Sequence, residues 1–194
     1  HTPSSPRNYG MRFVEGEYLA FLDGDDSFTP HALEVTVGKA KAHSADVVVF
    51  RREYELENEN LTPVTEVTLW NQTFDEIMMD REHWDSEKMF SGIWGMVTAR
   101  IFNVRFLTEN NIVFDESIPF AEDVDFCASV YSYANTVVYL PQTIGYHYFI
   151  NGGSLVQSMD KPGETLGGYA KGFALLFDKI MNMGIYVDYT INGI

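Results

Sequence analysis

The stretch that decides the fold is GEYLAFLDGDDSFTPHALE, residues 16–34. Within it, the apolar run over residues 18–22 is typical of a buried strand and ends in the acidic sequence DGDD, residues 23–26. Thr29 and Pro30 then have the residue types of a helix N-cap and a first helical position. Open α/β sheets bind ligands at the carboxyl ends of strands, just before such helices. Because neighbouring carboxylates repel one another unless a cation lies among them, this order favours a divalent-metal site over a solvated acidic turn.

Length, charge and cysteine content narrow the class of protein. A chain of 194 residues can form one domain with a sizeable core, alone or with a small appendage. The net charge of -15 argues against nucleic acid as a partner, because such a surface needs clustered Lys and Arg. A single cysteine, Cys127, excludes an intrachain disulfide and fits a reducing compartment. Without an apolar run of about 18 residues or a visible signal peptide, we expect a cytoplasmic protein, with peripheral attachment to the inner face of the membrane left open.

Periodicity predicts a strand, a helix and a second strand around the acidic sequence. Residues 31–42 have the pattern of a helix, and residues 46–50 consist of Asp46 and a continuous apolar run typical of a strand buried on both faces. With the first strand they predict a βαβ unit with a right-handed crossover. Residues 51–72 change to a charged, alternating pattern that suggests exposed antiparallel strands or a hairpin insertion.

The remaining elements are predicted more coarsely. The N-terminal residues 1–6 have the composition of a loop, and we divide the chain into a main domain over residues 1–160 and a helical extension over residues 161–194. Glu122, Asp123 and Asp125 lie where the first turn of a helix favours acidic side chains. The other predicted elements are helices over residues 73–90, 120–134 and 163–183, helical character ending at residues 110–111, and strands over residues 112–115 and 136–140.

Three segments in order identify a family. Arg7-Asn8-Tyr9-Gly10, then residues 16–26 ending in FLDGDD, then Phe120-Ala121-Glu122-Asp123 resemble the motifs of the family 2 glycosyltransferases with the GT-A fold. That family has an Arg-Asn-x-Gly turn, a strand ending in Asp-x-Asp, and a Glu-Asp pair that opens a later helix. The resemblance covers most of residues 7–155, and it rests on the three motifs together, since each alone is weak. It implies an α/β fold of GT-A type, a mixed sheet flanked by helices.

The resemblance implies an enzyme and a metal. Family 2 members transfer a sugar from a nucleotide-diphosphate sugar to an acceptor hydroxyl with inversion, here in polysaccharide or cell-surface glycan synthesis. Mg²⁺ or Mn²⁺ neutralises the departing diphosphate. By this resemblance Asp25 contacts the metal, and Asp23 contacts the metal or reaches it, or the ribose, through water. Arg7 and Asn8 are carried over as donor-binding residues. Asp26 is either a donor or metal contact or the cap of the following turn.

The same resemblance assigns the proton transfer to the later helix. Asp123 would be the general base that takes the proton of the acceptor hydroxyl, with Glu122 in a supporting role. Repulsion from Glu122 and Asp125 would raise the pKa of Asp123 against the effect of the helix dipole. The alternative is that these acids only complement the helix N-terminus.

Four further residues are weaker candidates. Trp94 and Gly95 match a segment on the acceptor side, where Met96 replaces the lysine common in the family; Trp94 is either a core residue or a platform for a sugar ring. His147 is interpreted as a third metal ligand or phosphate contact, or as a histidine on an edge strand. Ser154 follows two glycines where the family has a loop that closes over the donor.

Family members begin with a β-α-β segment that holds the nucleotide base, and only about six residues precede Arg7 here. We therefore expect an incomplete nucleotide-binding half, weak donor binding by this chain alone, and an exposed strand edge beside residues 18–22. Such an edge can pair with another chain, so a homodimer is expected as a possible partner state.

Two other classes of protein share parts of the acidic motif. In a haloacid-dehalogenase-like phosphatase Asp23 would be the nucleophile and Asp25 the general acid, but Asp26 and Ser27 replace the Gly-Thr or Gly-Val that normally follows, and no suitable downstream lysine is evident. In a calcium-binding module, the loop positions one, three, five and twelve of an EF-hand would be Asp23, Asp25, Ser27 and Glu34. Phe28 then occupies the position that needs glycine, and a strand precedes the loop where a helix should.

Overall fold

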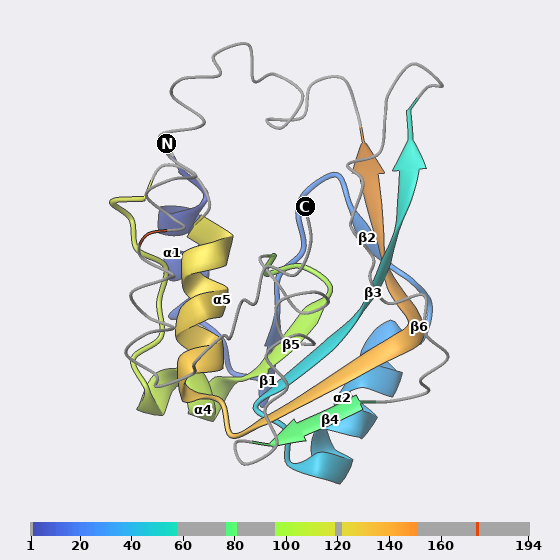
Figure 1. Ribbon diagram of the computed structural model, residues 1–194. Coiled ribbons are helices and arrows are strands. Elements are labelled where there is room, and N and C mark those ends of the chain that lie inside the picture. The colour runs from blue at the N-terminus through green and yellow to red at the C-terminus, as the bar shows by residue number, and fades with distance from the viewer. Residues whose placement is uncertain (1, 58–76, 81–95, 119–121, 151–173, 175–194) are drawn as a thin grey trace, which may run out of the picture.

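The computed structural model describes residues 2–57, 77–80, 96–118, 122–150 and 174 (Figure 1). In chain order, its elements are α1 (Ser4–Met11), β1 (Tyr18–Ala20), β2 (Ser27–Phe28), α2 (Ala32–His43), β3 (Val47–Leu56), β4 (Ile77–Asp80), β5 (Arg100–Asn103), α4 (Val104–Glu109), α5 (Glu122–Tyr133) and β6 (Thr136–Ile150). Among these described residues, no helix is long and apolar enough to cross a membrane.

The strands form one mixed sheet in the order β1-β5-β3-β6-β2, and β4 also pairs with β6. Because β5 is antiparallel to both β1 and β3, these two strands run in the same direction, and β6 runs parallel to β3. The carboxyl ends of β1, β3 and β6 therefore point toward the same end of the sheet, where Figure 1 also places the beginning of α5. The expected mixed sheet flanked by helices is confirmed.

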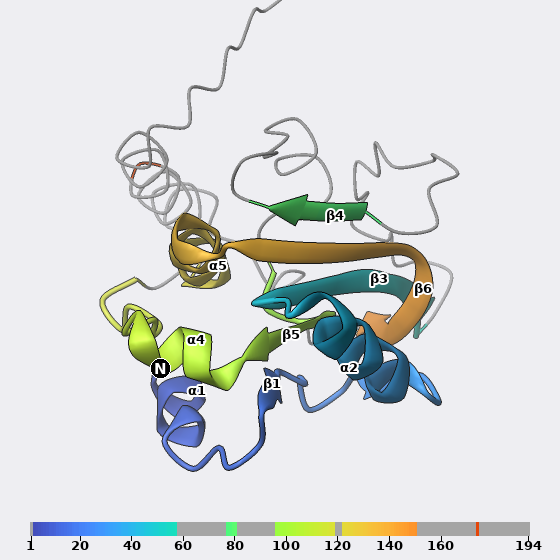
Figure 2. The ribbon, with the colours of Figure 1, turned by 90° about the horizontal axis from the view of Figure 1, so that it is seen from below.

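Helices cover both faces of the sheet (Figure 2). Successive residues of β3 point to opposite sides: Val47 and Val49 pack with α4 and α5, whereas Val48 and Phe50 pack on the side of α2. All four side chains are buried, so the continuous apolar run marks a strand covered on both faces, as predicted. On the α5 side, Phe114 and Phe126 stack with ring centroids 4.2 Å apart.

Strand β6 bends between its two halves (Figure 1). Its first half pairs with β4 and its second half with β2, while β3 follows it on the other side. The register changes where Phe50 pairs with Leu140 and the next residue, Arg51, pairs with Ile144. Gly145 is required at this bend, because a Cβ atom there would lie 2.4 Å from the Phe50 ring. The bend directs the second half of β6 toward the acidic loop, residues 23–26.

Several predictions about local structure were wrong. Residues 4–11 form α1, so the Arg-Asn-x-Gly segment is helical and not a turn. Helix α2 begins at Ala32, and Thr29 does not cap it: its hydroxyl donates to the Ile144 carbonyl at 2.9 Å, and its N–H to the Gly145 carbonyl at 3.0 Å. Pairing with β6 thus takes the groups that the sequence pattern assigned to a helix cap.

Predictions that depended on partners distant in sequence had mixed outcomes. The predicted strand–helix–strand unit is present, because β1 and β3 run parallel in one sheet with α2 between them in the chain, although β5 lies between the two strands. Residues 51–56 continue β3 parallel to β6 and do not form an antiparallel insertion. Residues 77–80 form strand β4, although a helix was predicted there, and residues 112–115 lack strand pairing. The predicted helix over residues 163–183 and the boundary near residue 160 lie, except for residue 174, outside the described residues.

Candidate active site

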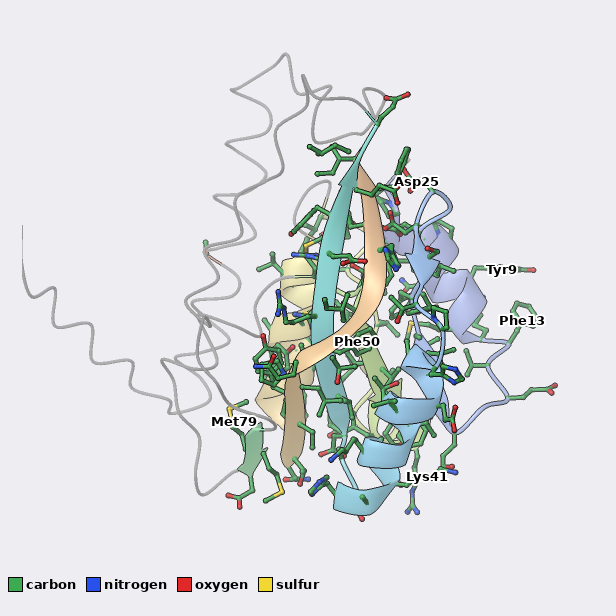
Figure 3. All side chains as sticks on the ribbon, turned by 90° about the vertical axis from the view of Figure 1, so that its right-hand side faces the viewer. Tyr9, Phe13, Asp25, Lys41, Phe50 and Met79 are labelled. Carbon is green, nitrogen blue, oxygen red and sulfur yellow. The ribbon has the colours of Figure 1, made fainter. Side chains whose placement is uncertain are left out.

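The acidic loop connects β1 to β2 at the carboxyl end of β1. Asp25 is exposed at this end of the molecule, and Figure 3 labels it there. The Asp23 side chain is 39% exposed, and the Asp26 N–H donates to the Asp23 carbonyl at 3.2 Å, which closes the turn. The loop therefore presents Asp23 and Asp25 as partly hydrated oxygen donors where open α/β sheets bind ligands.

Asp26 is directed differently from the other two acids of the loop. One carboxylate oxygen accepts the Tyr146 hydroxyl at 2.6 Å, and the other accepts the Phe149 N–H at 2.8 Å. Burial raises the pKa of Asp26, and these two hydrogen bonds oppose the rise. Both oxygens of Asp26 thus bind the second half of β6, so these contacts support a structural role over the donor contact expected from the sequence.

The second acidic group begins helix α5. Glu122 and Asp123 lie in its first turn, with side chains 10% and 20% exposed. Burial, followed by a hydrogen bond with Asp123 and repulsion from it, raises the pKa of Glu122 to about 7. Glu122 therefore keeps a proton to near-neutral pH.

Arg7 of α1 joins the two acidic groups. Its guanidinium lies 3.2 Å from Asp23 Oδ1, 3.0 Å from Glu122 Oε1 and 3.3 Å from Asp123 Oδ1. It also lies over the Phe114 ring, 5.4 Å from the ring centroid. Arg7 thus supplies a positive charge beside Asp23, and the predicted metal ion among the acids of the loop stays a prediction. The Arg7 side chain thus connects α1 with the acidic loop and with the first turn of α5, although Glu122 and Asp123 lie 115 and 116 residues beyond Arg7 in the chain.

Asn8 contacts the segment that leads into α5. Its amide nitrogen donates to the Phe114 carbonyl at 2.9 Å and to Glu116 Oε1 at 3.0 Å, and its amide oxygen accepts the Phe114 N–H at 2.9 Å. These bonds fix the chain before the Glu122-Asp123 pair. They support a positioning role, and the donor contact carried over from the family stays a prediction.

The weaker candidates have mixed outcomes. His147 lies on β6 between β2 and β3, so the prediction of an edge-strand histidine was wrong. Its Nδ1 lies 2.8 Å from Glu53 Oε1, and a metal or phosphate contact stays a prediction. Trp94, Gly95 and Ser154 lie outside the described residues.

The sequence pattern did not single out Arg52. Its guanidinium lies over the rings of Tyr54 and Tyr148, 5.5 and 5.9 Å from their centroids, and it contacts the sulfur of Met96. A cation is therefore present beside residue 96, although it comes from β3 and not from residue 96 itself. In the second half of β3 exposed and half-buried residues alternate, and Arg52 is one of the half-buried ones.

The oxygen donors of the acidic loop suit Mg²⁺ or Mn²⁺. Within the described ranges, no group of three or more His, Cys, Asp and Glu side chains could hold a metal ion. Mg²⁺ commonly takes one or two carboxylates and completes its coordination with substrate phosphates and water. The exposed Asp25 and the partly exposed Asp23 fit this shared mode of binding, in which the protein alone does not enclose the ion.

The chain matches a known family. The model of glycosyl transferase family 2 matches residues 2–105, more than half of the chain, and the chain belongs to this family. Its fold is similar to that of the crystal structure of S. aureus TarS 1–349 in complex with UDP-GlcNAc, with a TM-score of 0.67 and 22% sequence identity over 93% of this chain and 47% of that one.

Curated relatives include other glycosyltransferases. The poly(ribitol-phosphate) beta-N-acetylglucosaminyltransferase TarS of Staphylococcus aureus is 24% identical over 145 residues, which are 75% of this chain and 23% of that protein. The uncharacterized glycosyltransferase EpsJ of Bacillus subtilis is 28% identical over 82% of this chain and 45% of its own length. The succinoglycan biosynthesis protein ExoO of Rhizobium meliloti is 27% identical over 79% of this chain and 43% of its own. The chain thus spans less than half of each of these relatives.

Proposed function

We propose that this family 2 glycosyltransferase transfers a sugar from a nucleotide-diphosphate sugar to an acceptor hydroxyl, with a divalent metal at the acidic loop and a general base on α5. The observation that carries the proposal is the set of ion pairs of Arg7, which brings Asp23 within reach of the same guanidinium as Glu122 and Asp123. A metal-bound leaving group and a general base must lie around one anomeric carbon. The contact of both Asp23 and Asp123 with Arg7 supports such an arrangement.

Asp25 and Asp23 would hold Mg²⁺ or Mn²⁺ together with the donor diphosphate. When bound, the ion would neutralise the charge that develops on the departing nucleotide diphosphate. Arg7 stands beside Asp23 and adds a fixed positive charge next to the same carboxylate. A crystal structure of TarS contains UDP-GlcNAc, which makes UDP-sugars the first donors to test.

Asp123 would take the proton of the acceptor hydroxyl. As that oxygen bonds to the anomeric carbon, the bond from the anomeric carbon to the diphosphate oxygen breaks, and one displacement inverts the configuration. Glu122 supports this role because its pKa is raised to about 7, so it holds a proton and donates a hydrogen bond to Asp123. A carboxyl group that holds a proton beside the base can orient that base by a hydrogen bond.

The biological setting belongs to the same proposal. The names of TarS and ExoO refer to a poly(ribitol-phosphate) polymer and to succinoglycan, which supports a polysaccharide or cell-surface glycan as the product. A cytoplasmic site of action stays a prediction, with peripheral attachment to the inner face of the membrane left open. A homodimer and the division near residue 160 stay predictions.

The phosphatase and calcium-module alternatives are set aside. The match to glycosyl transferase family 2 argues against Asp23 and Asp25 as the nucleophile and general acid of a phosphatase. An EF-hand needs a helix before its loop, whereas β1 precedes the acidic loop and β2 begins within the twelve loop positions.

A screen of nucleotide sugars by thermal shift, with Mn²⁺ and with EDTA, followed by product analysis, tests the proposed function. We expect at least one nucleotide-diphosphate sugar to raise the melting temperature only when Mn²⁺ is present, and NMR of its product to show an inverted anomeric centre. Mn²⁺ alone and free nucleotide monophosphate are the controls. Retained configuration, or equal binding in EDTA, would contradict the mechanism.

A further inference from the structure

Tyr146 ties the acidic loop to the sheet. Its side chain is fully buried on β6, in an apolar cluster with Val48 and Phe50. Its hydroxyl donates to Asp26 Oδ2 at 2.6 Å and accepts the Asp23 N–H at 3.3 Å. One phenol oxygen therefore contacts the residues on both sides of the Gly24-Asp25 pair.

A second bond completes this attachment. The Phe149 N–H donates to the other oxygen of Asp26 at 2.8 Å, and the Asp26 N–H closes the turn on the Asp23 carbonyl at 3.2 Å. The Tyr146 ring is held by apolar neighbours, with the Phe28 centroid 5.5 Å from its own. The Tyr146 side chain is buried and Asp26 is half-buried. Breaking their bond therefore costs free energy, because a buried hydroxyl would be left without its hydrogen-bond acceptor.

We propose that Tyr146 is a positioning residue that sets the conformation of the acidic loop through Asp26 and the backbone of Asp23, and thereby orients Asp23 and Asp25 for a metal–diphosphate ligand. The inference rests on the proposed function of Asp23 and Asp25. It assigns to Asp26 a link to the sheet in place of a ligand contact. Tyr146 itself touches neither the metal nor the donor.

The variants Tyr146→Phe and Asp26→Asn distinguish the two roles of Asp26. Tyr146→Phe removes only the hydroxyl and keeps the ring in its apolar cluster. The matched control is Tyr131→Phe, which removes another buried hydroxyl, one that accepts the Arg100 Nε–H at 3.0 Å on α5, away from the acidic loop. Both variants remove a hydrogen-bonded hydroxyl from a buried tyrosine, so a general loss of stability appears in both.

Binding of Mn²⁺ in the presence of UDP, followed by electron paramagnetic resonance of free Mn²⁺, is the first readout. We expect Tyr146→Phe to weaken this binding by about tenfold, the size expected for one well-formed hydrogen bond, and Tyr131→Phe to change it by less than about twofold. Adding Tyr146→Phe to Asp26→Asn should weaken binding by less than Tyr146→Phe does in the wild-type protein, because the two changes share the Tyr146–Asp26 bond and only Tyr146→Phe also removes the acceptor of the Asp23 N–H. Wild-type affinity in Tyr146→Phe with weakened binding in Asp26→Asn would overturn the inference and make Asp26 a direct ligand.

Hydrogen exchange of the backbone amides of residues 23–26 separates this inference from the proposed function. If the wild-type protein bound neither Mn²⁺ nor UDP, the proposed function would fail, but the attachment would still be measurable in the free protein. We expect the Asp23 amide to exchange about tenfold faster in Tyr146→Phe than in Tyr131→Phe. Equal exchange rates in the two variants would refute the positioning role.

Discussion

The acidic loop and the first turn of α5 both carry adjacent carboxylates, but they keep different amounts of water. Asp23 is 39% exposed and Asp25 is exposed, whereas Glu122 and Asp123 are only 10% and 20% exposed. Hydrated carboxylates can bind a cation whose remaining ligands come from a substrate. Buried neighbouring carboxyl groups instead tend to retain a proton between them. The same residue types thus suit metal binding in one place and proton transfer in the other.

Arg7 shows that the two groups are not independent. Its guanidinium is the partner of Asp23 on one side and of Glu122 and Asp123 on the other. A change that removes one carboxylate therefore alters the charge balance of the other group. The predictions below test whether the two groups keep separate functions despite this shared partner.

The largest effect is expected from Asp123→Asn. Loss of the general base should lower the rate of transfer by about 10²- to 10⁴-fold, whereas binding of Mn²⁺ with UDP should be unchanged. Steady-state kinetics and calorimetry on the same preparation measure both quantities. Undiminished turnover would show that the base is elsewhere.

Asp25→Asn should have the opposite pattern, with the main effect on binding. We expect Mn²⁺-dependent binding of UDP to fall by about 100-fold or more, since loss of an outer hydrogen-bonded partner alone changes metal affinity about 10- to 100-fold. Glu34→Gln is the control, because Glu34 is exposed, pairs with His31, and would be a ligand only in the calcium-loop arrangement. A larger loss in Glu34→Gln than in Asp25→Asn would contradict the metal assignment.

Arg7→Ala tests the link between the two groups. It leaves Glu122 and Asp123 without their ion-pair partner, and we expect the free energy of unfolding at neutral pH to fall by about 3 kcal/mol. Arg105→Ala removes an exposed i,i+4 ion pair with Glu109 and should change the free energy of unfolding by no more than about 0.5 kcal/mol. Urea denaturation measures both, and similar losses in the two variants would mean that Arg7 is only a surface pair.

Glu122→Gln should alter the pH dependence of stability. Because the pKa of Glu122 is raised to about 7 from the 4.5 of an unperturbed glutamate, the folded protein holds the proton more tightly than the unfolded chain. The resulting contribution to the free energy of unfolding is fully present below pH 4.5 and is lost as the pH rises through 7. Its total is at most about 3 kcal/mol. We expect the free energy of unfolding of Glu122→Gln to lack this decline between pH 4.5 and 7. An unchanged pH profile would show that another group holds the proton.

The elements that sequence predicted well are those that a local pattern defines. The apolar run of residues 47–50 predicted the first part of β3, and the helical pattern of residues 31–42 predicted α2 within one residue at each end. The acids of α5 were placed correctly in a first helical turn, because charge at a helix N-terminus is a local signal.

The elements that it missed depend on partners distant in the chain. Strand β4 has a mixed sequence and is a strand because it pairs with the first half of β6. Thr29 and Pro30 have the residue types of a helix start, yet pairing with β6 uses the backbone and hydroxyl of Thr29. The acidic residues of the site could be listed from the motifs, but their joint contact with Arg7, and the bond from Tyr146 to Asp26, required the three-dimensional fold.

The position of Mn²⁺ tests the division of roles most directly. Anomalous diffraction from a crystal grown with Mn²⁺ and UDP would locate the ion independently of any assay. We predict a single anomalous peak about 2 Å from a carboxylate oxygen of Asp25, with UDP phosphate oxygens completing the coordination. A peak within coordination distance of Glu122 or Asp123, and none at the acidic loop, would contradict the separation of metal binding from proton transfer.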